Sequence, residues 1–133
     1  YIKGLKDSTI ETINIRKTKD LASRLNDGFK KRAQQLELVN KQIINSPYPI
    51  ILCADLNEIP LSYVYSRLKS HLCDAFLACG RGLGVTHTSG YPFMRIDYIM
   101  ASPELTINSF HLVQKELSDH YPIVSEISLK DSI

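Results

Sequence analysis

The sequence has little excess charge of either sign, few cysteines and no long hydrophobic run, and each shortage excludes a class of protein. Its 133 residues carry 16 Lys and Arg against 14 Asp and Glu, and this net charge of +2 is too small by itself to indicate a nucleic-acid partner. The three cysteines have no metal-type spacing, and their odd number argues against a disulfide framework. No stretch reaches the length of a membrane span, and no signal peptide is visible. Because the chain begins at Tyr1 rather than Met, we expect it to be part of a longer protein.

Two common functional signatures are missing as well. There is no Gly-Xaa-Ser-Xaa-Gly turn, and Ser118 lies too close to His120 along the chain for a usual catalytic triad, which sets a serine hydrolase aside. The glycines of residues 80–84 lack the preceding strand and following helix of a nucleotide-phosphate loop. What remains is an ordinary globular composition, 44% hydrophobic and 23% charged, with a length that allows one domain with a real core.

The hydrophobic pattern predicts an α/β chain with one long helix, one or two short helices and four or five strands. Apolar residues at spacings of three and four predict the long helix over about residues 19–45, and Ser46 and Pro47 should end it. The apolar run Ile50–Ala54 predicts a strand buried on both faces, with Cys53 as a small buried hydrophobic residue. We expect a short helix to begin near Ser62, and further strands over residues 85–88, 95–100, 105–113 and 123–129.

Acidic residues lie at the edges of three of these predicted strands. Asp55 and Asn57 follow the first, and because residues two apart in extended chain point to the same side, both could contact one ligand. Asp and Asn also simply favour turns, which is the alternative interpretation. Asp97 shares a strand face with Arg95, so an ion pair between these two neighbours is a rival explanation for Asp97. The third acid, Asp119, belongs to a turn that also carries a histidine.

Taken together, the three motifs resemble the endonuclease/exonuclease/phosphatase superfamily of metal-dependent phosphoesterases. The signatures of that superfamily are a Gly-Asp-(Phe/Leu)-Asn turn, an Arg-(Ile/Leu)-Asp-Tyr strand and a Ser-Asp-His-Xaa-Pro turn. This chain carries Ala54-Asp55-Leu56-Asn57, Arg95-Ile96-Asp97-Tyr98 and Ser118-Asp119-His120-Tyr121-Pro122, about 40 and then about 20 residues apart. Ala54 replaces the usual Gly, which costs little unless that backbone needs a positive φ. The resemblance runs from about residue 21 to 129.

The resemblance implies a four-layer α/β sandwich, in which two packed sheets are flanked by helices, and such a fold needs about twice this length. We therefore expect residues 1–133 to be the C-terminal part of a single catalytic domain. The N-terminal half of that domain, with an Asn and a metal-binding Glu, has no counterpart in the sequence. By itself the fragment should be weakly active or inactive, and an uncovered sheet face could lead it to self-associate.

The resemblance also implies a role for each matched residue. Asp55 would orient or deprotonate the attacking water or touch a metal, and Asn57 would hold the water and a phosphoryl oxygen. Asp119 would ligate the metal, with Asp55 as a second ligand. His120 would bond to the phosphate, and Asp97 would fix its ring and raise its pKa. The implied cofactor is Mg²⁺ or Mn²⁺, because Mg²⁺ and similar hard cations take carboxylate oxygen ligands.

The expected function is therefore divalent-metal-dependent hydrolysis of a phosphate ester, as in a phosphodiesterase or nuclease. The expected partner is a phosphate-ester substrate, and nucleic acid is one candidate for it. His87, in the strand before a turn, is a further candidate for the substrate side. Two alternatives stay open, since fold does not decide substrate: a phospholipid or sugar phosphatase, and a non-catalytic binding or structural module that retained the fold. The intact Asp55/Asn57 and Asp119/His120 pairs argue against the second alternative.

Overall fold

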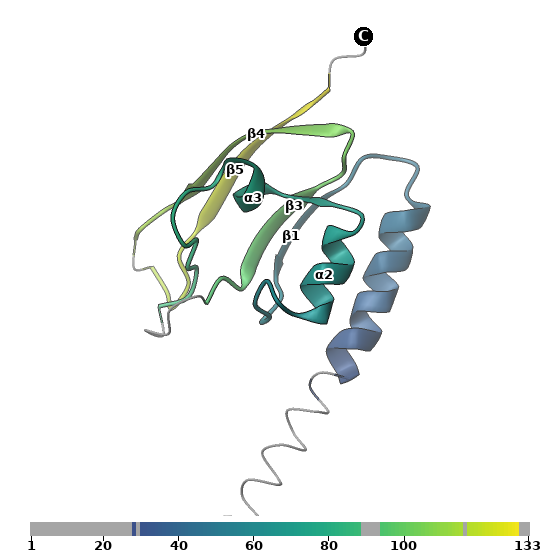
Figure 1. The fold of residues 1–133 in the computed structure, drawn as a ribbon, viewed down its shortest axis with the longest axis horizontal. Coiled ribbons are helices and arrows are strands. Elements are labelled where there is room, and N and C mark those ends of the chain that lie inside the picture. Colours follow the sequence, from purple (N-terminus) through teal and green to yellow (C-terminus); the bar gives the residue numbers. More distant parts are fainter. Residues whose placement is uncertain (1–27, 29, 89–93, 116, 131–133) are drawn as a thin grey trace, which may run out of the picture. The chain divides into compact units, whose positions relative to one another are not determined.

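The computed structural model describes residue 28 and residues 30–88, 94–115 and 117–130 (Figure 1). The chain divides into two compact units, Tyr1–Glu37 and Leu38–Ile133. Helical residues occur in both: 28 and 30–37 in the first unit, and 38–45 in the second. The helix ends at residue 45, before Ser46 and Pro47, as the sequence predicts, whereas its predicted start over residues 19–27 lies outside the described part. No helix among the described residues is long and apolar enough to cross a membrane.

Five strands in the described part of the second unit form two antiparallel sheets, as expected for an α/β sandwich. In the first sheet, β3 (Asp97–Ala101) lies between β1 (Ile51–Asp55) and β2 (Cys73–Asp74). The second sheet pairs β4 (Leu105–Leu112) with β5 (Ile123–Leu129). The two sheets meet where β5 packs against β3.

Two short helices follow β1 in the chain, and each begins with a side-chain cap. In α2 (Tyr63–Lys69) the Ser62 hydroxyl accepts a hydrogen bond from the Tyr65 backbone N–H at 3.1 Å, which confirms the predicted start near Ser62. In α3 (Ala75–Cys79) the Asp74 carboxylate accepts from the Phe76 N–H at 2.9 Å. The α3 helix packs against β2, β3 and β4, so it contacts strands of both sheets.

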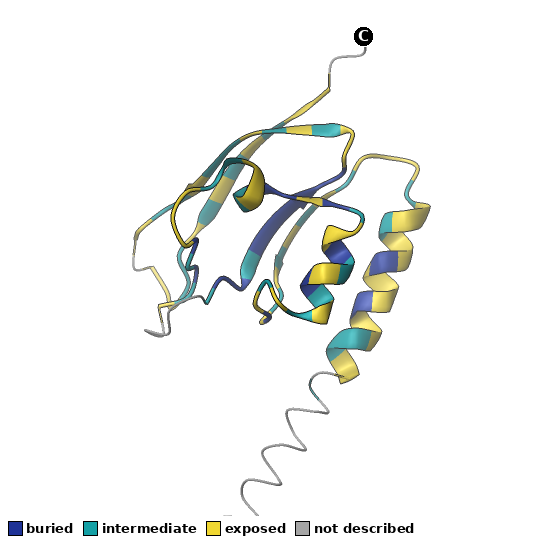
Figure 2. Ribbon diagram, in the orientation of Figure 1, coloured by how far each residue is buried: buried dark blue, intermediate teal, exposed yellow. Residues whose placement is uncertain are grey.

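The core of the second unit is built around β3. Tyr98, Met100 and Ala101 of this strand are almost fully buried, and Figure 2 shows β3 as the dark centre of the ribbon. The Tyr65 ring of α2 lies 5.1 Å from the Tyr98 ring, and Leu68 of the same helix is equally buried. The central strand is therefore covered on both faces, which fixes its first residue, Asp97, relative to the rest of the unit.

The prediction that the strand at residues 50–54 is buried on both faces is wrong. Side chains of β1 alternate between exposed and half-buried, with Ile51 53% exposed and Cys53 exposed as well. The physical reason is position: among the described strands β1 ends its sheet, whereas β3 lies in the middle and takes the doubly buried place. An apolar run cannot distinguish a central strand from an end strand.

The predicted strand over residues 85–88 is reduced to one isolated bridge, between His87 and His120. Much of its bonding is irregular, because the backbone N–H groups of both Thr86 and His87 donate to the same carbonyl, that of Met94, at 3.0 and 3.2 Å. Two bonds to one carbonyl form a turn-like contact rather than a ladder. This short segment nevertheless contributes directly to the candidate site.

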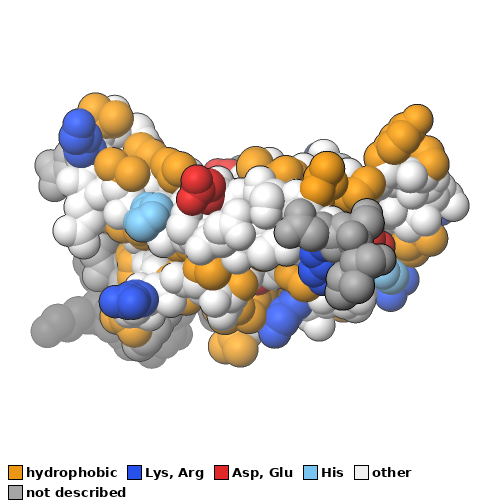
Figure 3. Space-filling model, turned by 90° about the horizontal axis from the view of Figure 1, so that it is seen from above, with side chains coloured by type: hydrophobic (Ala, Val, Ile, Leu, Met, Phe, Trp, Pro, Cys, Tyr) orange, Lys and Arg blue, Asp and Glu red, His pale blue; other side chains and the backbone are white. Residues whose placement is uncertain are grey.

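Several large hydrophobic side chains of the described residues are exposed. Val124 and Leu129 of β5 and Leu117 before it are each more than half exposed. Figure 3, which looks onto one face, shows several separate hydrophobic groups, with acidic, basic and histidine side chains dispersed among them. In this view no broad area carries charge of a single sign.

Candidate active site

Arg95, the first residue of the second motif, is used inside the fold. Its Nη1 donates to Asp74 Oδ2 at 2.6 Å, and the side chains of the pair are only 5% and 1% exposed. The Tyr65 hydroxyl donates to the same carboxylate oxygen at 2.7 Å. Burial by itself lowers the pKa of Arg95, but the hydrogen bonds to Asp74 and Tyr65 outweigh it and raise the pKa above its usual value. The guanidinium therefore stays charged.

The ion pair between Arg95 and Asp74 argues against the rival explanation for Asp97, which is an ion pair with Arg95. In that explanation Arg95 would neutralise Asp97, but the Arg95 guanidinium donates to Asp74, a residue 21 positions earlier in the chain. The guanidinium also lies over the Phe76 and Tyr98 rings, 4.7 and 4.8 Å from their centroids, within the core. The Arg95 guanidinium is therefore engaged by Asp74 and the core rather than by Asp97.

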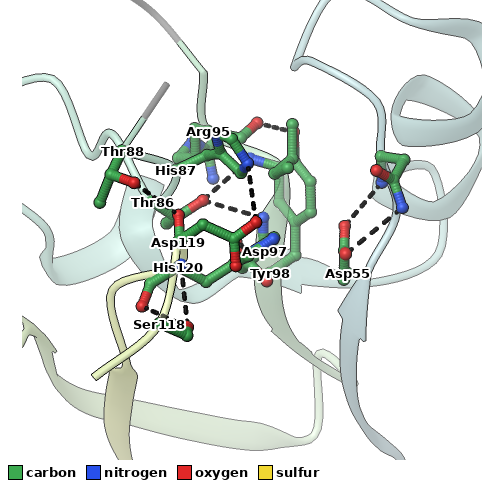
Figure 4. A network of polar contacts seen from close by, with 12 residues as sticks. Asp55, Thr86, His87, Thr88, Arg95, Asp97, Tyr98, Ser118, Asp119 and His120 are labelled. Atoms are coloured by element: carbon green, nitrogen blue, oxygen red, sulfur yellow. Dashed lines mark hydrogen bonds and ion pairs between the residues drawn. The ribbon is translucent and has the colours of Figure 1, made fainter. Parts of the chain in front are cut away.

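Asp97 pairs with His120, as Figure 4 shows. The Nδ1 atom of His120 lies 2.9 Å from Asp97 Oδ2, and both side chains are partly buried, 29% and 18% exposed. The hydrogen bond to Asp97 raises the pKa of His120; burial opposes this, and the charges of Asp97, Asp55 and Asp119 add to the rise. A carboxylate on Nδ1 orients the ring and leaves Nε2 for another partner.

Two hydroxyl groups hold the backbone on either side of this pair. Thr86 is fully buried, and its Oγ1 accepts hydrogen bonds from the N–H groups of Ile96 and Asp97, both at 3.1 Å. The Ser118 hydroxyl accepts from the His120 N–H at 3.0 Å and donates to the His120 carbonyl at 3.1 Å. Each member of the pair is thus attached to a backbone that a neighbouring hydroxyl group holds in place.

Asp55 reaches the same place from β1. Antiparallel register sets it directly opposite Asp97, and ligand atoms of Asp55, Asp97 and His120 all lie within 4.8 Å of one another. Asn57 follows with a left-handed φ of 49°; its backbone N–H donates to Asp55 Oδ1 at 2.8 Å and its side-chain amide to Oδ2 at 3.3 Å. Asp55 and Asn57 therefore form a turn, and the same turn sets the Asp55 carboxylate beside Asp97 and His120. Ala54 is not among the described residues with positive φ, so its substitution for Gly carries no strain.

Asp119 and His87 lie on the other side of His120. The ligand atoms of these three residues also lie within 4.8 Å of one another, with His87 Nε2 at 3.7 Å from Asp119 Oδ2. The Asp119 side chain is 73% exposed, whereas that of His87 is 21% exposed. The structure thus gathers the matched acids, His120 and His87 into two trios that share His120, and Asn57 adjoins them through its hydrogen bonds to Asp55.

Some contributors to this site were not found from the sequence. Thr86 gave no signal, because a threonine in an apolar segment is equally at home in any strand. Asp74 caps α3, but its ion pair is with distant Arg95, which no local pattern indicates. Ser118 lies inside a recognised motif, and only its own role was missing.

The two antiparallel sheets and their helices define the chain as an α/β sandwich of the kind that the motifs implied. A model of the Endonuclease/Exonuclease/phosphatase family matches residues 12–120, and the chain belongs to this family. No curated protein was found to match the chain.

Solved structures with the same fold include several members of this family. A mannosyl-6-phosphatase of Bacteroides thetaiotaomicron superposes with a TM-score of 0.63 at 23% identity, over 75% of this chain and 46% of that one. A family protein of Bacteroides vulgatus gives 0.63 at 22% identity, over 76% and 45%. One of Beutenbergia cavernae gives 0.62 at 23% identity, over 75% and 31%. The chain thus spans less than half the length of these structures.

Proposed function

We propose that residues 1–133 are the C-terminal part of a single catalytic domain that hydrolyses phosphate esters with the help of a divalent metal ion. Family membership and the match to less than half of each solved structure support this proposal. The observation that carries it is the 2.9 Å contact between His120 Nδ1 and Asp97 Oδ2 beside the Asp55 carboxylate. A polarised imidazole next to strand-edge carboxylates has the groups that phosphoester hydrolysis needs.

His120 would bind the substrate. Its Nε2, opposite the nitrogen held by Asp97, would donate a hydrogen bond to a phosphoryl oxygen, and the raised pKa favours the protonated ring that does so. Asp97 would act through His120, as the residue that sets its orientation and proton. His87, whose ring meets the His120 ring edge-to-face at 4.8 Å, would line the substrate side.

Asp55 and Asn57 would manage the attacking water. One Asp55 oxygen would accept the proton of the water, while the turn formed with Asn57 holds the carboxylate in place. The Asn57 amide has two N–H groups, and one of them bonds to Asp55, so the second would be available to the water and a phosphoryl oxygen.

The metal would be held by Asp119 and Asp55. Their carboxylate oxygens are the hard donors that Mg²⁺ or Mn²⁺ prefer, and such an ion needs only one or two carboxylates from the protein. The two acids belong to different trios, which are joined by His120. When bound, such an ion supplies positive charge that offsets the negative charge developing on the phosphoryl oxygens.

The test measures hydrolysis by the protein that contains this chain. We expect Mg²⁺-dependent hydrolysis of bis(p-nitrophenyl) phosphate, abolished by EDTA, and much weaker activity from residues 1–133 alone. His120→Ala should lower kcat by about 10²-fold or more, the scale of general acid–base and electrostatic contributions, with a smaller change in KM. His111→Ala is the matched control, because His111 is an exposed histidine of β4 outside both trios. Full activity in EDTA, or equal loss in the two variants, would refute the proposal.

A phosphatase acting on a sugar phosphate is the second candidate. It is favoured by one observation, that a structure of similar fold is a mannosyl-6-phosphatase. Comparing a nucleic-acid oligomer with mannose 6-phosphate as substrates would separate the two: cleavage of the diester only supports the phosphodiesterase or nuclease, and phosphate release from the monoester only supports the phosphatase. Hydrolysis of neither substrate nor of the nitrophenyl ester would support the non-catalytic module.

A further inference from the structure

One of the two trios is rich in imidazole nitrogen, a donor that Mg²⁺ and Mn²⁺ do not prefer. His87, Asp119 and His120 offer two imidazole nitrogens and one carboxylate oxygen, all within 4.8 Å of one another. Within this trio, His87 Nε2 lies 3.7 Å from Asp119 Oδ2. The other trio offers two carboxylates and shares only His120 with this one.

The backbone that carries the three side chains is already in place. His87 and His120 form a bridge between two segments more than 30 residues apart. Next to it, the Tyr121 N–H donates to the Thr86 carbonyl at 2.7 Å, and the Thr88 N–H and hydroxyl both donate to the Asp119 carbonyl, at 2.9 and 3.1 Å. Because these bonds fix both segments, a ligand joining the three side chains would have little backbone to order.

His120 also has the outer partner that metal-binding histidines usually have. A ligating histidine almost always donates its other ring N–H to a carboxylate or carbonyl, which sets the tautomer and makes the ligating nitrogen more basic. Asp97 occupies that place, with Oδ2 at 2.9 Å from His120 Nδ1. The bond leaves Nε2 of His120 as the ligand atom.

The donor set selects the kind of metal. Mg²⁺ requires oxygen ligands in near-octahedral order, whereas Zn²⁺ is held by imidazole nitrogen and carboxylate oxygen in a tetrahedron. Ligands about 2.0–2.1 Å from a tetrahedral ion lie about 3.3 Å apart. The His87–Asp119 contact of 3.7 Å is close to that separation, and the remaining ligand atoms, all within 4.8 Å, would need side-chain rotations to close the set around an ion.

We propose that His87, Asp119 and His120 form a site for Zn²⁺ or a similar borderline transition metal, with a water as the fourth ligand and Asp97 as the outer partner of His120. The site is distinct from the oxygen-ligand site for Mg²⁺ or Mn²⁺, although it uses Asp119 in common. Zn²⁺ bound here would occupy His120 Nε2 and withdraw it from a substrate phosphate. Binding does not depend on the proposed function, whereas this inhibitory consequence does.

The test is direct binding to the chain, with no enzymatic readout. Co²⁺, which reports a tetrahedral site through its visible absorption, is titrated into the chain, and Zn²⁺ affinity is then measured by calorimetry in excess Mg²⁺. We expect one ion per chain and a tetrahedral Co²⁺ spectrum without a thiolate charge-transfer band. Asp97→Asn should weaken Zn²⁺ binding about 10–100-fold, the usual effect of losing an outer-shell partner.

Ligand variants with a matched control complete the test. His87→Gln and Asp119→Asn should each remove the tetrahedral spectrum, while His111→Gln, an equivalent change at an exposed histidine outside the trio, should leave it unchanged. Asp119 is 73% exposed, so Asp119→Asn keeps the test valid should His87→Gln perturb folding. A thiolate band, equal loss with His111→Gln, or displacement of Zn²⁺ by Mg²⁺ at similar concentration would overturn the proposal. Failure of hydrolysis with intact Zn²⁺ binding would refute the proposed function alone.

Discussion

Asp74→Asn should strongly destabilise the described core, because it removes one charge of a buried ion pair. The substitution keeps the side-chain shape, and the amide oxygen can still accept the Phe76 N–H, so the cap of α3 survives. What is lost is the negative charge that meets Arg95 at 2.6 Å in a place where Arg95 and Asp74 are 5% and 1% exposed. Removing one partner of a buried ion pair leaves the other charge uncompensated and typically costs about 3–5 kcal/mol.

The measurement is urea unfolding at 25 °C. The chain contains no tryptophan, so far-ultraviolet circular dichroism follows the transition. For a protein of this size the slope is about 2 kcal/mol per molar urea, so the midpoint should fall by about 2 M. Asp119→Asn is the matched control, since the same change at a 73% exposed side chain should shift the free energy of unfolding by no more than about 0.5 kcal/mol.

A double-mutant cycle makes the reasoning refutable. Arg95→Met removes the cation and keeps an unbranched side chain beside the Phe76 and Tyr98 rings. With Asp74→Asn and Arg95→Met combined, neither charge remains buried alone, so the double variant should lose less than the sum of the single losses, by about 1.5 kcal/mol or more. Strictly additive losses, or a loss below about 1 kcal/mol for Asp74→Asn, would show that the pair does not act as a buried unit.

Other contacts give predictions that single measurements can check. Asp97→Asn should lower the pKa of His120, because the hydrogen bond to Asp97 raises it. NMR titration of the imidazole without metal measures this pKa, and an unchanged value would show that Asp97 does not bond to His120. The stability that this pair adds should be complete below the ordinary histidine pKa of about 6.5 and be lost as the pH rises through the raised value. Thr86→Val leaves two backbone N–H groups without their acceptor and should cost about 1–3 kcal/mol in urea unfolding; unchanged stability would contradict its role. Gly84→Ala should lower the Tm more than Gly82→Ala: both have positive φ, but only at Gly84 would the new Cβ meet a phenylalanine ring, at 2.5 Å, and equal shifts would contradict this.

Sequence reasoning succeeded where local pattern and structure have the same cause. The alternation over residues 123–129 matches β5 residue for residue, and the predicted strand over 105–113 is one residue longer than β4. The helix ends where a Pro makes continuation unfavourable. The Asp97–His120 contact was also foreseen, because the motifs that carry these residues imply a shared site.

The rest depended on long-range contacts that no local pattern encodes. The split of residues 73–79 into β2 and α3 rests on pairing with β3 and on the Asp74 cap. The partner of Arg95 could not be inferred, since a long guanidinium side chain reaches acids far from it in sequence. Exposure along β1 depends on which strands lie beside it, a property of the sheet rather than of the run of residues.

The two carboxylates at the strand ends show why the candidate site would favour a cation. Asp55 faces Asp97 across the antiparallel ladder, an arrangement of like charges that usually destabilises a sheet. The next residue pair along the ladder is hydrogen-bonded, so the two acids occupy the closer, non-hydrogen-bonded kind of position. Each carboxylate has its own donors, Asn57 for Asp55 and His120 for Asp97, and these hold it without removing the repulsion between the two. A positive charge between them, either a bound cation or the protonated ring of His120, would offset this repulsion. The repulsion therefore favours the binding of a cation at this edge of the sheet.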